Sequence, residues 1–160
     1  MGFIRLSFEG SRTKWFIGVG YAPTESSDED VKDNFFIEFN SFITKHRKSD
    51  DSYTIVMGDF NAEVGCEKNM FNHIFSFGER NSNGDRLRAL CDEQKLFNIS
   101  SFYPKRKNLK WTWKKAESIH SNRYCIKQLD YILSSDRSIF KDFYIYSLTS
   151  PPKNATLSIF

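Results

Sequence analysis

The stretch Tyr53-Thr54-Ile55-Val56-Met57-Gly58-Asp59-Phe60-Asn61 decides the fold of this chain. Its apolar run ends at Gly58 and is typical of a strand buried on both faces in a central sheet. Asp59 and Asn61 stand two residues apart where the strand stops, so their side chains point to the same side if the extended conformation continues. A carboxylate beside an amide can hold a water, a metal ion or a phosphate oxygen. An ordinary turn is the competing interpretation, because Gly, Asp and Asn all favour turns.

The segments before this stretch predict a hairpin and a helix. Residues 3 to 8 and 14 to 21 alternate in polarity as two strands do, with Tyr21 at the second strand's end. Tyr21 is either a packed aromatic or a hydroxyl that contacts phosphate. Capping residues before Asp30 then favour a helix from about Asp28 to Lys48. Its apolar stripe is expected to contain Phe35, Phe36, Phe39, Phe42 and Ile43.

The segments after it predict a long loop, a second helix and three further strands. The loop covers residues 62 to 83, and the helix extends from Asp85 to about Lys95. Strands are expected over 96–103, 126–133 and 140–147. Within 126–133, alternation places Leu129, Tyr131 and Leu133 on one face and Asp130 on the other. A carboxylate at mid-strand needs a partner if it is buried, so Asp130 belongs to an ion pair or to a site.

Positive charge is concentrated in the second half of the chain. Residues 1–79 hold 8 basic and 13 acidic side chains, whereas residues 80–160 hold 15 and 7. Arg106, Lys110, Trp111 and Lys115 interleave basic and aromatic groups, a pattern that suits contact with a nucleic-acid backbone and stacking on its bases. The alternative is a solvated hairpin whose tryptophans pack inward.

Length and composition predict one globular domain, and the pattern of strands with two helices predicts that it is α/β. The chain has 160 residues, 39% of them hydrophobic and 27% charged, without an internal repeat. Neither a membrane span nor a signal peptide is visible, so we expect an intracellular protein, nuclear or cytoplasmic and not secreted. The odd, widely spaced cysteines Cys66, Cys91 and Cys125 indicate neither a disulfide framework nor a zinc site.

Four motifs in order resemble the endonuclease/exonuclease/phosphatase superfamily. They are Tyr21-Ala22-Pro23-Thr24, Gly58-Asp59-Phe60-Asn61, Trp111-Thr112-Trp113 and Gln128-Leu129-Asp130-Tyr131. The residues of these motifs are most similar to the branch of LINE-type retrotransposon endonucleases and craniofacial development protein 2-like proteins. The Asn-x-Asn-Gly sequence that begins at Asn81 is similar to the same branch. The resemblance covers about residues 14 to 146. It implies a DNase I-like fold, a four-layer α/β sandwich of mixed sheets flanked by helices.

The resemblance also implies a chemistry and a role for each matching residue. The reaction is phosphodiester hydrolysis by in-line attack of water, dependent on magnesium or manganese, with nucleic acid and more specifically DNA as partner. Asp59 would position the water or move a proton, Asn61 would hold the phosphate or Asp59, and Tyr21 would donate to a phosphoryl oxygen. Asp130 would orient a catalytic histidine, and Thr112 would support the site. Asp59 and Asn61 are also the candidate metal ligands.

Some parts of the family pattern have no match in this chain. The Ser-Asp-His triplet expected after Asp130 is missing, as are the upstream Asn and metal-binding Glu. We therefore expect an incomplete domain over residues 1–150 and an irregular tail over 151–160, inactive or weakly active alone. A nucleic-acid-binding remnant without catalysis, a lipid or inositol phosphatase, and a fragment that does not fold stably are the alternatives.

Overall fold

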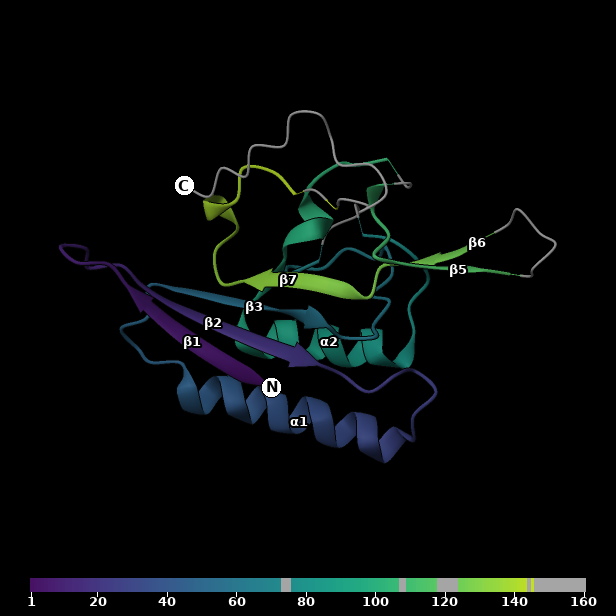
Figure 1. The fold of residues 1–160 in the computed structure, drawn as a ribbon, viewed down its shortest axis with the longest axis horizontal. Helices are drawn as coiled ribbons and strands as arrows, with labels where there is room; N and C mark the ends of the chain where they lie inside the picture. The colour runs from purple at the N-terminus through teal and green to yellow at the C-terminus, as the bar shows by residue number, and fades with distance from the viewer. Residues whose placement is uncertain (73–75, 107–108, 118–123, 144, 146–160) are drawn as a thin grey trace.

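The computed structural model describes residues 1–72, 76–106, 109–117, 124–143 and 145. Its centre is a mixed five-stranded sheet in the order β1-β2-β3-β7-β4, with two long helices packed against it (Figure 1). The fold therefore is α/β with a mixed sheet, as the sequence predicts. The sheet strands are β1 (Gly2–Ser7), β2 (Lys14–Tyr21), β3 (Tyr53–Asp59), β4 (Phe97–Asn98) and β7 (Asp130–Ser134).

Strand pairing brings the ends of three strands together. β1 and β2 form the expected antiparallel hairpin, and β2 runs parallel to β3. β7 lies antiparallel on the other side of β3, and β4 joins β7 at the far edge. Because β2 and β3 are parallel, both of their carboxyl ends lie at one end of the sheet, next to the beginning of β7.

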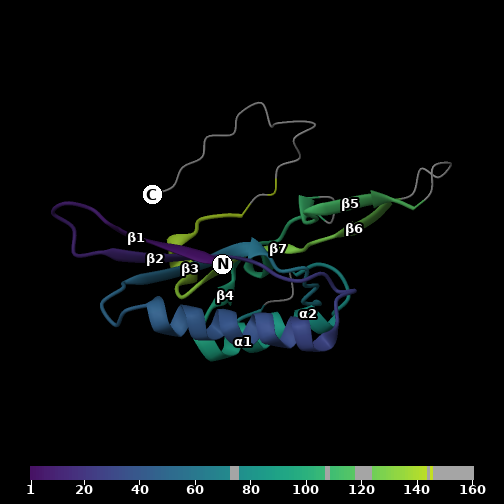
Figure 2. The same cartoon turned by 60° about the horizontal axis from the view of Figure 1, so that its bottom comes forward.

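Both helices cover the same face of the sheet (Figure 2). Of the stripe predicted for α1 (Glu29–His46), Phe36, Phe39 and Ile43 are buried, and Phe35 and Phe42 are partly buried. α2 (Ser82–Gln94) buries Leu87, Leu90 and Cys91. Phe39, for example, is fully buried, and a Cβ placed at Gly20 of β2 would lie 3.0 Å from its ring. The missing side chain of Gly20 thus leaves room for an aromatic ring of α1. The core residues are Phe16, Phe36, Phe39, Ile43, Val56, Phe60, Leu87, Leu90, Leu96, Tyr131 and Leu133.

The prediction that β3 is buried on both faces is wrong for one of them. Thr54 and Val56 face the helices and are buried, whereas Ile55 and Met57 face the other way and are only half-buried. The reason is that α1 and α2 lie on one side of the sheet. We call the other side the outer face; it carries Ile4, Leu6, Trp15, Ile17, Val19, Ile55, Met57 and Ile132.

Three predicted strands differ from the structure. Residues 96–103 form only the short β4, followed by a 3-10 turn over Ile99–Phe102, where Ser101 donates to the Asn98 carbonyl. The strand over 126–133 is interrupted at Gln128 and Leu129, and its two parts belong to different sheets. Of the strand expected over 140–147, residues 140–143 are not extended in a sheet, and residues 144, 146 and 147 lie outside the described part.

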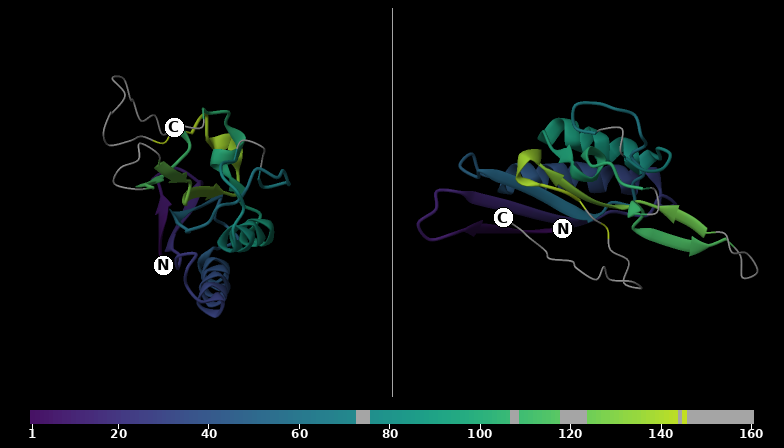
Figure 3. Two further views of the ribbon diagram at one scale, coloured as in Figure 1. Left: turned by 90° about the vertical axis from the view of Figure 1, so that its right-hand side faces the viewer. Right: turned by 90° about the horizontal axis from the view of Figure 1, so that it is seen from above.

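A two-stranded hairpin projects beyond the end of the main sheet (Figure 3). It consists of β5 (Trp113–Ala116) and β6 (Tyr124–Lys127), paired antiparallel. The three cysteines are unpaired, as predicted. No helix within the described residues has the length and apolar character needed to cross a membrane.

Candidate active site

Three predicted site residues form one row across three strands. Tyr21 is the register partner of Asp59 between β2 and β3, and Asp59 is the partner of Asp130 between β3 and β7. Side chains of paired residues project from the same face of a sheet, here the outer face. Tyr21 is 69% exposed, Asp59 is half-buried, and Asp130 is exposed. The structure therefore brings a phenol and two carboxylates together at the end of the sheet, open to solvent on one side.

Asp59 has an electrostatic environment that opposes its ionisation. Burial raises the pKa of Asp59 above its ordinary value, and the neighbouring charge of Asp130 adds to that rise. The backbone N–H of Asn61, which donates to Asp59 Oδ1 at 2.9 Å, partly counteracts it. A carboxyl whose pKa lies closer to neutrality is better suited to proton transfer than an ordinary surface aspartate.

Asn61 does not continue the strand. The sequence pattern allows an extended conformation through Asn61, but β3 ends at Asp59. The φ of Asn61, 47°, places it in the left-handed region, where asparagine is one of the few residues tolerated. Its side-chain Nδ2 donates to the Ala22 carbonyl at 2.9 Å, which ties the loop after β2 to the loop after β3. Asn61 thus contacts Asp59 through its backbone N–H and the loop after β2 through its side-chain Nδ2.

Two asparagines at the N-terminus of α2, the cap residue Asn81 and Asn83 in the first turn, contact the loop after β3, and the sequence pattern assigns them no role in the site. The Nδ2 atoms of Asn81 and Asn83 each lie 3.3 Å from the Asn61 carbonyl oxygen. The Asn-x-Asn-Gly motif was the available signal. Spacing alone does not show that α2 begins against the strand end.

Thr112 supports the row from the base of the hairpin. Its Oγ1 accepts hydrogen bonds from the backbone N–H groups of Leu129, at 2.9 Å, and Asp130, at 3.2 Å. Its own N–H donates to the Lys127 carbonyl at 2.8 Å. Thr112 therefore fixes the point where the chain leaves β6 and enters β7, and with it the position of Asp130.

The predicted nucleic-acid contacts lie in and before the β5–β6 hairpin, with unequal exposure. Arg106 and Lys115 are exposed, Trp111 is half-buried, and Lys110 is only 8% exposed. Burial also lowers the pKa of Lys110. Lys114, which was not singled out, places its Nζ 3.6 Å from the ring centroid of Tyr124 and 5.7 Å from that of Trp111. Such cation–π contacts hold the charge at the surface of the hairpin.

The row does not by itself form a complete metal site. Asp59 and Asp130 supply two carboxylates and Asn61 one amide oxygen, whereas hard cations take six or more oxygen ligands. Within the described ranges, no group of three or more His, Cys, Asp or Glu side chains could hold a metal ion. The residues present therefore fit a magnesium ion poorly without further oxygen ligands.

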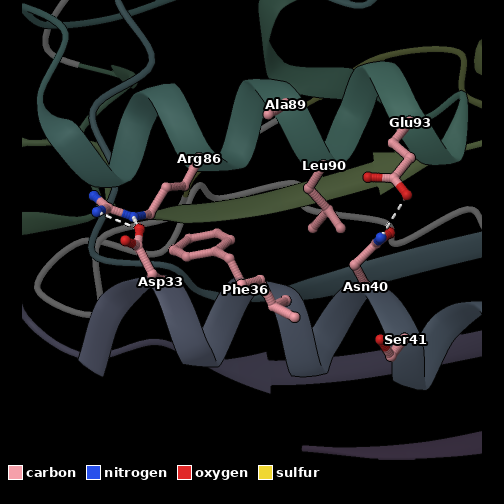
Figure 4. Close-up of a pocket in the computed structure, with 9 residues that line it drawn as sticks. Asp33, Phe36, Asn40, Ser41, Arg86, Ala89, Leu90 and Glu93 are labelled. Atoms are coloured by element: carbon pink, nitrogen blue, oxygen red, sulfur yellow. Dashed lines mark hydrogen bonds and ion pairs between the residues drawn. The ribbon is translucent and has the colours of Figure 1, made fainter. Parts of the chain in front are cut away.

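A groove lies between α1 and α2 (Figure 4). Both helices cover the face of the sheet opposite the row (Figure 2). Phe36 and Leu90 line the groove, and its polar groups pair with one another: Arg86 Nη2 lies 2.6 Å from Asp33, and Asn40 donates to Glu93 at 2.7 Å. These pairs join the two helices. The polar groups of the groove therefore hold α1 and α2 together, and we assign no reaction to them.

Comparison with known proteins supports the fold. No protein-family model and no curated protein matches the sequence. Among solved structures, the chain is similar to an endonuclease/exonuclease/phosphatase family protein from Leptotrichia buccalis, with a TM-score of 0.52 and 17% identity, over 84% of this chain and 42% of that one. It also resembles the endonuclease domain of TRAS1, a telomere-specific non-LTR retrotransposon, with a TM-score of 0.49 and 12% identity, over 82% and 48%.

The similarity to the Leptotrichia buccalis protein shows the fold alone. The chain spans less than half the length of either structure, at 42% and 48%. The described strands and helices match the DNase I-like fold, as the motif order implies.

Proposed function

We propose that this chain is a nuclease-like phosphodiester hydrolase domain that acts on nucleic acid, more specifically DNA. The observation that carries the proposal is the row of Tyr21, Asp59 and Asp130 at the carboxyl ends of β2 and β3. A fold shared with an endonuclease/exonuclease/phosphatase family protein supports it.

The chemistry assigned to the row follows from the positions of its groups. Asp59, with its raised pKa, accepts a proton from the attacking water or delivers one to the leaving oxygen. The exposed Tyr21 hydroxyl donates to a phosphoryl oxygen, where negative charge develops in the transition state. The charge of the neighbouring Asp130 disfavours ionisation of Asp59 and so adds to the rise of its pKa. A divalent cation, magnesium or manganese, is proposed from the family resemblance, and no step is assigned to it.

The proposed activity of the isolated chain is weak. His46 is the one histidine among the described residues, and it packs against Phe3 and Phe42, with ring centroids 4.6 and 4.8 Å away, on the helix side of the sheet. No imidazole of the described part therefore reaches the row. General acid–base help of this kind contributes roughly 10² to 10⁴ in rate.

The test is nicking of supercoiled plasmid in the presence of Mg²⁺. Slow nicking that Asp59→Ala abolishes would support the proposal. Glu38→Ala, which removes an exposed acid of α1, is the matched control and should leave the rate unchanged. Nicking that persists in Asp59→Ala would contradict the assignment of the row.

A second candidate is binding of nucleic acid without cleavage. The exposed hairpin, with Lys115 and the Lys114 cation–π pair, is the observation that favours it. Binding to a DNA duplex that weakens with salt, survives Asp59→Ala and is lost on Lys114→Ala plus Lys115→Ala, without any nicking, would select this function.

A further inference from the structure

The loop after β3 is held by a cluster of hydrogen bonds at the N-terminus of α2. Asn81 Oδ1 accepts from the N–H of Gly84 at 2.8 Å and from that of Glu63 at 2.8 Å, so one side chain caps the helix and pins the loop. A Cβ at Gly84 would lie 1.9 Å from the Glu63 carbonyl oxygen. The helix start and the loop therefore touch backbone to backbone.

The donors of this cluster converge on one atom, the carbonyl oxygen of Asn61. Asn81 and Asn83 each direct Nδ2 to it at 3.3 Å, and Asn83 Nδ2 also donates to the Pro23 carbonyl at 2.9 Å. Asn83 is 0% exposed, and its Oδ1 lacks a hydrogen-bond partner within the described part of the chain. A buried polar atom without a partner is unfavourable, so the burial of this oxygen lowers the stability of the fold.

The acceptor of those bonds belongs to a residue in the left-handed region, beside the central carboxylate. Asn61 has a φ of 47°, a conformation that is rare for residues other than glycine. Turning Asn61 back toward extended backbone would redirect both its carbonyl and its N–H. The N–H is the group that donates to Asp59 Oδ1 at 2.9 Å.

We infer that Asn81 and Asn83 are positioning residues: by binding the Asn61 carbonyl they hold Asn61 in its left-handed conformation and so orient the carboxylate of Asp59. The inference deepens the proposed function, because Asp59 is the residue to which that function assigns proton transfer. A second clamp keeps α2 in place: Glu25 accepts from the backbone N–H groups of Ser82 and Asn83, both at 3.2 Å, and its own carbonyl accepts from the buried Lys32 at 3.0 Å.

The decisive variant is Asn81→Asp, which separates positioning from capping. Aspartate keeps the oxygen that accepts from Gly84 and Glu63 and is as good a helix cap as asparagine, but it has no donor for the Asn61 carbonyl. Asn83→Ala removes the second donor. Asn34→Asp makes the same chemical change at an exposed position of α1 and is the matched control.

The measurement is amide hydrogen exchange by NMR on the metal-free full chain. We expect the Asn61 amide to exchange up to about tenfold faster in Asn81→Asp and Asn83→Ala, the equivalent of one lost hydrogen bond. The adjacent amide of Phe60, which donates to the Leu129 carbonyl at 2.9 Å, should be unchanged and serves as the internal control. In an Asn61→Gly background, where the left-handed conformation is unstrained, Asn81→Asp should have a smaller effect.

Two outcomes would overturn the inference. One is an unchanged Asn61 amide in both variants, and the other is an equal acceleration at Phe60, which would indicate general loosening. The proposed function fails separately: selective exchange at Asn61 in a chain that never nicks DNA would keep the positioning role and remove the nuclease.

Discussion

At the scale of single residues, Asp59 is under opposing influences. Burial and Asp130 favour its neutral form, while the Asn61 N–H favours the carboxylate. Burial is the largest of these effects, so the folded protein binds a proton at Asp59 more tightly than the unfolded chain does. The higher pKa of Asp59 in the folded state has a measurable consequence for stability.

Asp59→Asn should stabilise the protein at neutral pH. A group whose pKa is raised by folding contributes stability below its unfolded pKa and loses it as pH rises through the folded pKa. At pH 7 the wild-type carboxylate is charged and unfavourable, whereas asparagine is neutral and still offers an oxygen to the Asn61 N–H. Urea unfolding at pH 7 and pH 3 should show a larger gain at pH 7. A gain that is larger at pH 3 would contradict the assigned cause of the shift.

The sequence predicts the row better than it predicts the residues that hold it. Tyr21 and Asp59 end apolar strands and Asp130 begins one, and the resemblance of their motifs to one family assigns all three to one site. Asn81 and Asn83 are 20 and 22 residues from Asn61, across a loop without periodicity, so their contact depends on where α2 packs. Lys110 shows the same limit, because its burial is set by tertiary packing and not by the basic pattern around it.

At the scale of elements, the register of β2 against β3 places the site. Gly20 and Gly58 are register partners one residue before Tyr21 and Asp59. A Cβ at Gly58 would lie 1.9 Å from the Gly20 carbonyl oxygen, and the φ of Gly58 is +156°. The strands approach so closely here that a side chain would separate the two ends that carry the site.

Gly58→Ala should therefore destabilise the protein by about 3 kcal/mol or more, because backbone must move to admit the methyl group. Gly2→Ala is the control: it lies in β1, and a Cβ there meets nothing closer than Val19, at 3.8 Å. Chemical denaturation of both variants measures the difference. Equal stability of the two would show that β2 and β3 are free to separate.

Element boundaries were predicted well where periodicity is long and poorly where it is short. The helix expected over 28–48 is observed over Glu29–His46, because a stripe of phenylalanines at helical spacing fixes it. The strand expected over 126–133 is interrupted because Gln128 and Leu129 are buried at the hairpin base, and Thr112 binds the Leu129 N–H. An alternating pattern does not reveal that two halves pair with different partners.

At the scale of the whole molecule, the two faces of the sheet carry similar residues but differ in how far they are buried. Both are apolar, yet the helices bury one face, while Val19, Ile4 and Leu6 of the outer face are 44%, 55% and 39% exposed. Exposed apolar patches of this kind are uncommon on monomeric proteins. Because the helices bury only one face, we expect most of the free energy of folding to come from burial on that face.

The same substitution on the two faces tests this asymmetry. Val56→Ala removes two methyl groups from a fully buried site between β3 and the helices and should destabilise the protein by about 2 kcal/mol. Val19→Ala, on the neighbouring strand but on the outer face, should change stability by no more than about 0.5 kcal/mol. Urea denaturation at one protein concentration and again at a tenfold lower one measures both. If Val19→Ala destabilises as much as Val56→Ala, the outer face is buried in solution, and the sheet has a second covering layer.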